Sequence, residues 1–281
     1  MSTIQQALTT AFSQLNQLPD VAARLEAEIL LAYALAKPRA YLHTWPQQVL
    51  EKSVLDRFGT LVQRRCRGEP VAYITGQREF WGLPLTVSTA TLIPRPETER
   101  LVEIALEKIP AQASWHIADL GTGSGALAFA LASERPRCEI TGTDISTAAL
   151  AIAKANRQRL NLTNVRFIAG RWFDPLSGRR FDLVISNPPY VASGDPHLQQ
   201  GDLRFEPRQA LSAGPDGLEA IREIVSSAHA HLQPGGWLML EHGFAQGDAV
   251  VKLFTDNGFA HVQCHRDYAE RERATVGRFT G

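Results

Sequence analysis

The sequence is poor in cysteine. It has three cysteines in 281 residues, Cys66, Cys138 and Cys264, and they are widely separated with no C-x-x-C pair. Disulfide frameworks and zinc sites need paired or clustered cysteines, whereas an odd number of isolated ones is typical of free thiols in a reducing compartment. The eight histidines are scattered along the chain. We therefore expect no disulfide, no bound metal and a cytoplasmic location.

Neither sign of charge is in excess, because 29 Lys and Arg residues balance 29 Asp and Glu residues. A balanced chain lacks the overall positive field that gives proteins sequence-independent affinity for nucleic acid. Long apolar runs are also missing. The longest, Ile29–Ala36, is far too short to span a bilayer, and no basic region followed by an apolar one marks a secretory signal. We expect neither a membrane span nor stable binding of nucleic acid.

Apolar residues make up 44% of the chain, so it can bury a sizeable core in one large or two modest domains. In the first quarter of the sequence these residues recur at helical spacing, as in Leu25, Ile29 and Tyr33, with Asp20 as a candidate N-cap. This pattern predicts an N-terminal helical domain over residues 1–75.

Residues 76–97 have a different pattern, made of short β-prone pieces. Glu79–Trp81 and Leu85–Val87 flank the turn-forming sequence Gly82–Pro84, and the stiff sequence Pro94–Pro96 closes the segment. We interpret this segment as a β-hairpin that links the helical domain to the rest of the chain.

Residues 98–281 alternate between strand-like and helix-like patterns. Such alternation predicts an α/β fold with a doubly wound, mostly parallel sheet, whose ligands bind beyond the carboxyl ends of the strands where the topology reverses. The expected strands are Trp115–Leu120, Cys138–Asp144, Val165–Ala169, Phe181–Ser186, Trp237–Glu241, His261–His265 and Ala274–Phe279, and the expected helices are Gly125–Ser133, Thr147–Leu160, Leu218–Leu232 and Asp248–Asp256.

A glycine-rich loop follows the first expected strand of this sheet. The loop reads Gly121-Thr122-Gly123-Ser124-Gly125, and glycines at alternate positions let the backbone turn tightly and approach a ligand closely. Gly121, Gly123 and Ala126 also satisfy the G-x-G-x-x-A form of the dinucleotide fingerprint, so NAD is an alternative to other cofactors. A purely structural turn is the remaining alternative. We expect a cofactor-binding loop.

Two acidic residues refine this expectation. Asp144 is the last residue of the second expected strand, where a carboxylate can accept hydrogen bonds from both ribose hydroxyls of either cofactor. Capping of the next helix is its structural alternative, although Ser146 competes for that place. Asp119 lies two residues before Gly121, and a carboxylate there suits a cationic amino-acid group but repels a pyrophosphate. Asp119 therefore favours S-adenosylmethionine over NAD.

The most specific sequence is Asn187-Pro188-Pro189-Tyr190, which directly follows the fourth expected strand. Two prolines fix the backbone and remove two N–H donors, so the segment is rigid and rich in acceptors. The Asn187 side-chain carbonyl, the Pro188 main-chain carbonyl and the Tyr190 ring together suit a flat group with an N–H2, such as a carboxamide or an exocyclic base amine. A simple proline turn is the alternative.

Taken together, these residues resemble the HemK/PrmC family of release factor glutamine methyltransferases, within the Rossmann-like S-adenosylmethionine-dependent enzymes. The resemblance covers nearly the whole chain, and the combination of I-P-R-P-E-T-E with N-P-P-Y is highly specific. It is carried by Tyr73–Gly76, Glu79–Gly82, Leu92–Glu99, Gly121–Gly125, Asn187–Tyr190, Phe205–Pro207 and Ala210–Leu211.

The resemblance implies roles for particular residues. The cofactor, S-adenosyl-L-methionine, would lie with its methionine part on Gly121–Gly125, its ribose on Asp144 and its adenine near Trp172. Asn187–Tyr190 would bind the target glutamine, with Asn187, Pro188 and Tyr190 as the catalytic residues. Arg171 departs from the family pattern, because an acidic residue usually stands there and contacts the adenine amino group.

The resemblance further implies that the enzyme methylates the side-chain amide nitrogen of the glutamine in the Gly-Gly-Gln loop of peptide chain release factors. The helical domain would recognise the protein substrate, with the cluster Arg57, Arg64, Arg65 and Arg67 either facing that partner or forming an ordinary solvated helix surface. Alternatives are an amino methyltransferase acting on adenine or guanine in nucleic acid, a glutamine methyltransferase acting on a ribosomal protein, and a non-catalytic dinucleotide-binding or adaptor protein.

Overall fold

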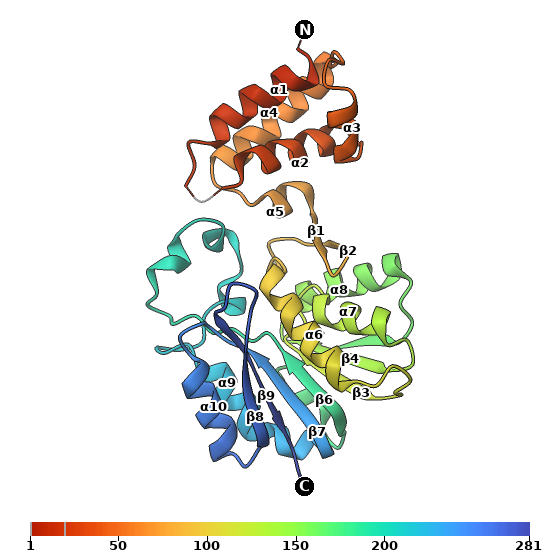
Figure 1. Cartoon of the computed structure of the whole chain (residues 1–281), viewed down its shortest axis with the longest axis vertical. Helices are drawn as coiled ribbons and strands as arrows, with labels where there is room; N and C mark the ends of the chain where they lie inside the picture. The colour runs from red at the N-terminus through yellow and green to blue at the C-terminus, as the bar shows by residue number, and fades with distance from the viewer. Residues whose placement is uncertain (1, 20) are drawn as a thin grey trace. The chain divides into compact units, whose positions relative to one another are not determined.

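The computed structural model describes residues 2–19 and 21–281, so the candidate N-cap Asp20 lies outside the described residues. The chain forms two compact units (Figure 1). The first contains the residues up to 77 together with the short segment 199–205, and the second contains residues 78–198 and 206–281. None of the helices in the described ranges has the length and apolar content that a membrane crossing requires.

The first unit is a bundle of helices around its own apolar core. A capping box begins the bundle, since the Thr3 hydroxyl accepts the Gln6 N–H and the Gln6 side chain accepts the Thr3 N–H. Leu15, Leu30 and Leu31 are fully buried between the helices. The helices are α1 (Ile4–Leu15), α2 (Ala23–Leu35), α3 (Arg39–Thr44), α4 (Lys52–Cys66) and α5 (Val71–Thr75).

Arg65 does not belong to an exposed basic surface. Its side chain is 6% exposed, and its guanidinium pairs with Glu26 at 2.7 Å and with Asp202 at 3.0 Å, inside the first unit. For Arg65 both alternatives, a residue that faces a protein partner and an ordinary solvated helix surface, are therefore wrong, because this guanidinium is buried and paired with two carboxylates. Arg64 is half-exposed and pairs with Glu69.

A two-stranded hairpin follows the helices, formed by β1 (Gln77–Phe80) and β2 (Leu83–Thr86), and all of it but Gln77 belongs to the second unit. Its turn lies at Trp81 and Gly82, which both have positive φ, as the tight turns of hairpins require. The predicted hairpin is confirmed, but Leu83 and Pro84 belong to the strand and not to the turn.

The main sheet of the second unit has seven strands in the order β5-β4-β3-β6-β7-β9-β8 (Figure 1). The five strands from β5 to β7 are parallel, and β9 runs antiparallel to both of its neighbours, so the predicted mostly parallel, doubly wound sheet is confirmed. The strands are β3 (His116–Leu120), β4 (Glu139–Asp144), β5 (Val165–Ala169), β6 (Phe181–Ser186), β7 (Leu232–Glu241), β8 (Ala260–Arg266) and β9 (Glu272–Arg278).

Helices cover both faces of this sheet (Figure 1). They are α6 (Glu99–Lys108), α7 (Ala126–Glu134), α8 (Thr147–Leu160), α9 (Glu219–Ser227) and α10 (Gly247–Asp256). Side chains of the strands alternate between the faces, so that Leu183 and Ile185 of β6 enter the core cluster that contains α6 and α7 residues, and Val184 enters the cluster that contains α9 and α10 residues.

Candidate functional site

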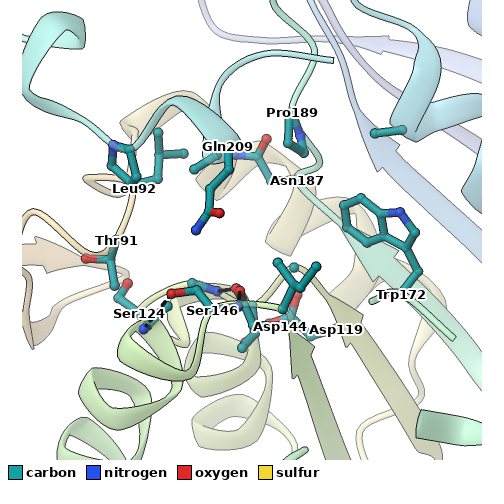
Figure 2. A pocket seen from close by; sticks show the side chains of 18 of the residues that line it. Thr91, Leu92, Asp119, Ser124, Asp144, Ser146, Trp172, Asn187, Pro189 and Gln209 are labelled. Carbon is teal, nitrogen blue, oxygen red and sulfur yellow. Dashed lines mark hydrogen bonds between the residues drawn. The ribbon is translucent and has the colours of Figure 1, made fainter. Parts of the chain in front are cut away.

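The site lies where the strand order reverses. The chain runs from β3 outward through β4 to β5 and then returns to place β6 on the other side of β3, so β3 and β6 flank the switch point. A cavity of about 380 Å³ opens at the carboxyl ends of these strands (Figure 2). Its lining residues all belong to the second unit.

The glycine loop forms one wall of the cavity. Gly121, Gly123 and Gly125 all have positive φ, a conformation that favours glycine. A Cβ at Gly125 would lie 2.3 Å from the Phe129 ring, whereas a Cβ at Gly123 would meet no protein atom within 4 Å. Gly125 thus lets the loop pack onto α7, and Gly123 leaves room for a ligand against its backbone. The loop lines the cavity through Gly121, Thr122, Gly123 and Ser124.

Asp119 is a buried carboxyl beneath this loop. Its residue is 1% exposed, Oδ2 accepts a hydrogen bond from the Thr122 hydroxyl, and Oδ1 has no hydrogen-bond partner among the described residues. Burial raises the pKa of Asp119 to about 7, with a smaller contribution from the charge of Asp144. Because a buried carboxyl oxygen without a partner is costly, this side chain on the cavity wall suits a cationic ligand group.

Asp144 ends β4 and faces the same cavity (Figure 2). Its carboxylate accepts the Gly123 N–H at 2.9 Å and the Ser146 N–H at 2.8 Å, while the Ser146 hydroxyl caps α8 through the Ala149 N–H. Burial raises the pKa of Asp144, and the two backbone donors counteract that rise. Each carboxylate oxygen has a second lone pair, so Asp144 keeps acceptor capacity for two ligand hydroxyls.

Trp172 closes one side of the cavity (Figure 2). Its backbone has φ +42°, held in part by a hydrogen bond from the Thr143 hydroxyl to its carbonyl at 2.9 Å. Its neighbour Arg171 forms a two-atom ion pair with Glu223, and its guanidinium lies 5.7 Å from the indole centroid. The arginine that departs from the family pattern is thus neutralised by Glu223, and the flat indole remains on the cavity wall.

Asn187 and Pro189 line the cavity, on the opposite side from the glycine loop (Figure 2). Pro188 is buried, and the Tyr190 ring packs against the apolar cluster of the α9 face. Neither Pro188 nor Tyr190 is among the described residues that line the cavity. The Tyr190 hydroxyl donates to Glu241 Oε1 at 3.1 Å, and burial together with the Glu241 charge raises its pKa.

Some cavity residues were not predicted from the sequence as site residues, among them Thr98 and Gln209. Figure 2 shows the Gln209 carboxamide reaching into the cavity across from Asp144. Glu206 contributes indirectly, because its buried carboxylate accepts the Ile93 N–H at 3.0 Å and pairs with Arg95. It thereby joins the loop that contains Ile93 and Arg95 to its own loop, and residues of both loops line the cavity. In the sequence, the segments I-P-R-P-E-T-E and F-E-P contain the residues that make these contacts.

Comparison with known proteins identifies relatives of both units. A family model described as the PrmC N-terminal domain matches residues 6–76, and one described as a methyltransferase domain matches residues 112–270. A protein of Vibrio cholerae named release factor glutamine methyltransferase is 49% identical over 99% of this chain and 97% of its own length. Proteins with the same name from Salmonella typhimurium and Pseudomonas aeruginosa are 50% and 51% identical, each over 94% of this chain and 96% of their length.

Solved structures share the fold at lower sequence identity. A methyltransferase from Pyrococcus furiosus superposes with a TM-score of 0.54 and 19% identity, over 78% of this chain and 97% of that one. The 16S rRNA N2 G1207 methyltransferase of T. thermophilus, solved with AdoMet and guanosine, superposes with a TM-score of 0.53 and 19% identity, over 72% of this chain and 49% of that one. The likeness to these two structures concerns the fold alone.

Proposed function

The chain belongs to the release factor glutamine methyltransferases, and from that premise we propose how its cavity performs the transfer and on which atom. The donor is S-adenosyl-L-methionine, and the acceptor is the side-chain amide nitrogen of the glutamine in the Gly-Gly-Gln loop of a peptide chain release factor. The observation that carries the proposal is one cavity with the Asn187 carboxamide on one wall and, on the other, the buried carboxyl of Asp119, whose Oδ1 atom has no hydrogen-bond partner among the described residues.

The residues that follow β3, β4 and β5 would hold the donor. Asp119 would face the cationic amino group of the methionine part, and the backbone of Gly121–Ser124, which lines the cavity, would lie along it. Asp144 would accept hydrogen bonds from the ribose hydroxyls, and the Trp172 indole would pack on the adenine. When bound, the group supplies an activated methyl on a sulfonium.

The acceptor amide is held at the end of β6. The Asn187 side-chain carbonyl and the Pro188 main-chain carbonyl accept the two N–H bonds of the glutamine amide, and Pro189 provides an apolar contact. Tyr190 supports this turn through its hydroxyl bond to Glu241 and through its packed ring.

Orientation is the main contribution of the protein to catalysis. An amide nitrogen is a poor nucleophile because its lone pair is delocalised into the carbonyl, so the two acceptors must direct that lone pair toward the methyl group. In one displacement the amide nitrogen would bond to the methyl carbon as the bond from that carbon to the sulfonium sulfur breaks. The donor would leave as a neutral thioether, and the amide proton would pass to water. We assign no general base.

The protein substrate is chosen by more than the cavity, because adenine also presents an N–H2 on a flat π system. A small, neutral glutamine motif provides little binding energy, so we assign recognition of the larger protein surface to the helical unit. Three isolated cysteines are consistent with a reducing cytoplasm as the compartment.

The test is a comparison of methyl acceptors with labelled S-adenosylmethionine. Wild-type enzyme is incubated with a release factor, with the same factor carrying glutamine-to-alanine in its Gly-Gly-Gln motif, and with single-stranded and duplex DNA and RNA. We expect label on the intact factor alone. Label on nucleic acid, or undiminished label on the alanine variant, would overturn the proposed acceptor.

A further inference from the structure

A buried carboxyl lies behind the Asn-Pro-Pro-Tyr turn. Glu241, the last residue of β7, is 1% exposed and is not among the described residues that line the cavity. It accepts the Tyr190 hydroxyl at 3.1 Å, and its Oε2 atom has no hydrogen-bond partner in the described part of the chain. Burial of such a group costs folding free energy, and an apolar residue of similar size would pack there at lower cost. Its presence therefore calls for another explanation.

Thr98 connects this carboxyl to the cavity. It is 4% exposed and lines the cavity, and its hydroxyl favours the ionised form of Glu241, whose pKa burial raises to about 7. On its other side, the Thr98 oxygen accepts the Asn187 side-chain amide at 3.1 Å. Tyr190 thus contacts Glu241 directly, and Asn187 contacts the threonine whose hydroxyl favours the ionised form of that carboxyl.

The direction of the hydrogen bond between Thr98 and Asn187 follows from the ionised state of Glu241. Above its pKa of about 7 this carboxylate can only accept, so the single hydroxyl proton of Thr98 is directed toward Glu241, and the Thr98 oxygen is left as an acceptor. An acceptor can bind only the N–H2 end of a carboxamide, so the Nδ2 atom of Asn187 turns to Thr98. The Oδ1 atom of Asn187 then remains for a ligand N–H in the cavity.

We propose that Thr98 and Glu241 are positioning residues for methyl transfer, which fix the rotamer of Asn187 so that its carbonyl oxygen meets the substrate amide. This inference rests on the proposed role of Asn187 as acceptor for the substrate nitrogen. The other charged groups near Glu241 are Arg273, which favours its ionised form, and Glu97, which disfavours it. Neither donates a hydrogen bond to Asn187 among the described contacts, so the chain through Thr98 carries the orientation.

The test uses matched pairs of variants. Thr98→Val removes the hydroxyl at nearly constant shape, and Thr98→Ser keeps it. Glu241→Met removes the acceptor at similar volume, and Glu241→Gln keeps an acceptor oxygen. We expect Thr98→Val and Glu241→Met each to lower kcat about 10- to 100-fold, because a small misplacement of a positioned group has effects of this order. S-adenosylmethionine affinity and Tm should stay near wild type, and the Ser and Gln variants should recover most of the rate.

The double variant distinguishes a shared positioning role from a simple loss of packing. Because both residues act through one chain of hydrogen bonds, Thr98→Val combined with Glu241→Met should lower kcat no further than either change alone. Additive losses, or losses of rate that merely follow losses of Tm, would overturn the inference, as would wild-type kcat in Thr98→Val.

The outcome is separable from the proposed function. The rates are measured on whichever acceptor the wild-type enzyme labels, so a different acceptor refutes the proposed substrate and leaves this comparison intact. Without any acceptor, the Asn187 side-chain N–H2 protons should exchange with water faster in Thr98→Val than in Thr98→Ser. Equal exchange would show that Thr98 does not hold the amide.

Discussion

A Cβ atom at Gly121 would lie 3.0 Å from Cζ3 of the Trp172 ring. The glycine loop after β3 and the indole after β5 therefore meet with no space for a side chain between them. In the proposed complex they form one continuous surface under the methionine and adenine parts of the donor.

Gly121→Ala should disturb this surface more than it disturbs the fold. Alanine at positive φ costs about 1 kcal/mol of stability, and the new methyl group also pushes Trp172 out of place. We expect S-adenosylmethionine affinity, measured by calorimetry, to fall about 10-fold or more. Gly178→Ala is the matched control, because Gly178 also has positive φ but nothing lies within 4 Å of its Cβ position. If both variants bind alike, the Gly121–Trp172 contact is unimportant for binding.

Asp144→Ala should weaken S-adenosylmethionine binding through the loss of charged acceptors for the ribose hydroxyls. Each such hydrogen bond contributes about 1.5 to 3 kcal/mol. The variant also frees the Gly123 N–H, so the loop must be checked by Tm. Asp256→Ala, an exposed carboxylate that pairs with Lys252 on α10, serves as control. Unchanged affinity in Asp144→Ala would remove this residue from the site.

Binding of S-adenosylmethionine should depend on pH through Asp119. Burial raises the pKa of this carboxyl to about 7, so in the free protein it is largely protonated below that pH. A bound ammonium group favours the ionised form, so affinity should rise as pH increases from about 6 to about 7.5, with release of protons. Calorimetry in buffers of different ionisation enthalpy measures this release. Asp119→Asn should bind weakly at every pH and release no proton, and proton release that persists in it would assign the titration elsewhere.

The same shift predicts the direction of a stability change. The folded-state pKa of Asp119 lies above its ordinary value of 3.8, so its contribution to stability is complete below about pH 4 and is lost as the pH rises through about 7. Wild-type protein should therefore lose more free energy of unfolding over this range than Asp119→Asn does. Denaturant titrations at about pH 5 and about pH 8 make the comparison.

Much of the sheet could be predicted from local patterns. The boundaries of α8, β5 and β6 agree with the expected ranges, because each has a clear period and a clear stop. β7 was expected to begin at Trp237 but begins at Leu232. Its first half contains Pro234, Gly235 and Gly236, which are unusual in a regular strand, and the pairing with β6 is interrupted there by a bulge. The helix expected over Leu218–Leu232 ends at Ser227, and a 3-10 turn, Ala228–His231, follows it.

Contacts between segments that are distant in the sequence could not be predicted from it. The Arg65–Asp202 pair joins residues 137 positions apart, and no local pattern places the segment 199–205 in the helical unit. α6, Glu99–Lys108, was not assigned, although Leu101, Val102 and Ala105 carry a helical period. In the site, Asp119 and Asp144 were chosen from strand ends, but the partnerless Asp119 oxygen depends on burial, which local sequence does not reveal.

The two units should be separable. We expect a variant without residues 1–77, in which residues 199–205 are replaced by a short glycine-serine linker, to fold and bind S-adenosylmethionine, because the sheet has its own core. It should methylate release factor poorly, since we assign recognition of the protein surface to the helical unit. Calorimetry and methylation rates measure the two properties. Full activity of this variant on the intact factor would show that the helical unit is dispensable.

The most direct test of the central claim is to locate the transferred methyl group and to ask whether Asn187 is needed to place it. Release factor is incubated with S-adenosylmethionine that carries a deuterated methyl group, and the labelled peptide is fragmented in a mass spectrometer. Wild-type enzyme should place the label on the side-chain nitrogen of the Gly-Gly-Gln glutamine, while Asn187→Ala should bind the donor with little change and transfer almost no label. Label on any other atom, or transfer by Asn187→Ala at near wild-type rate, would contradict the account.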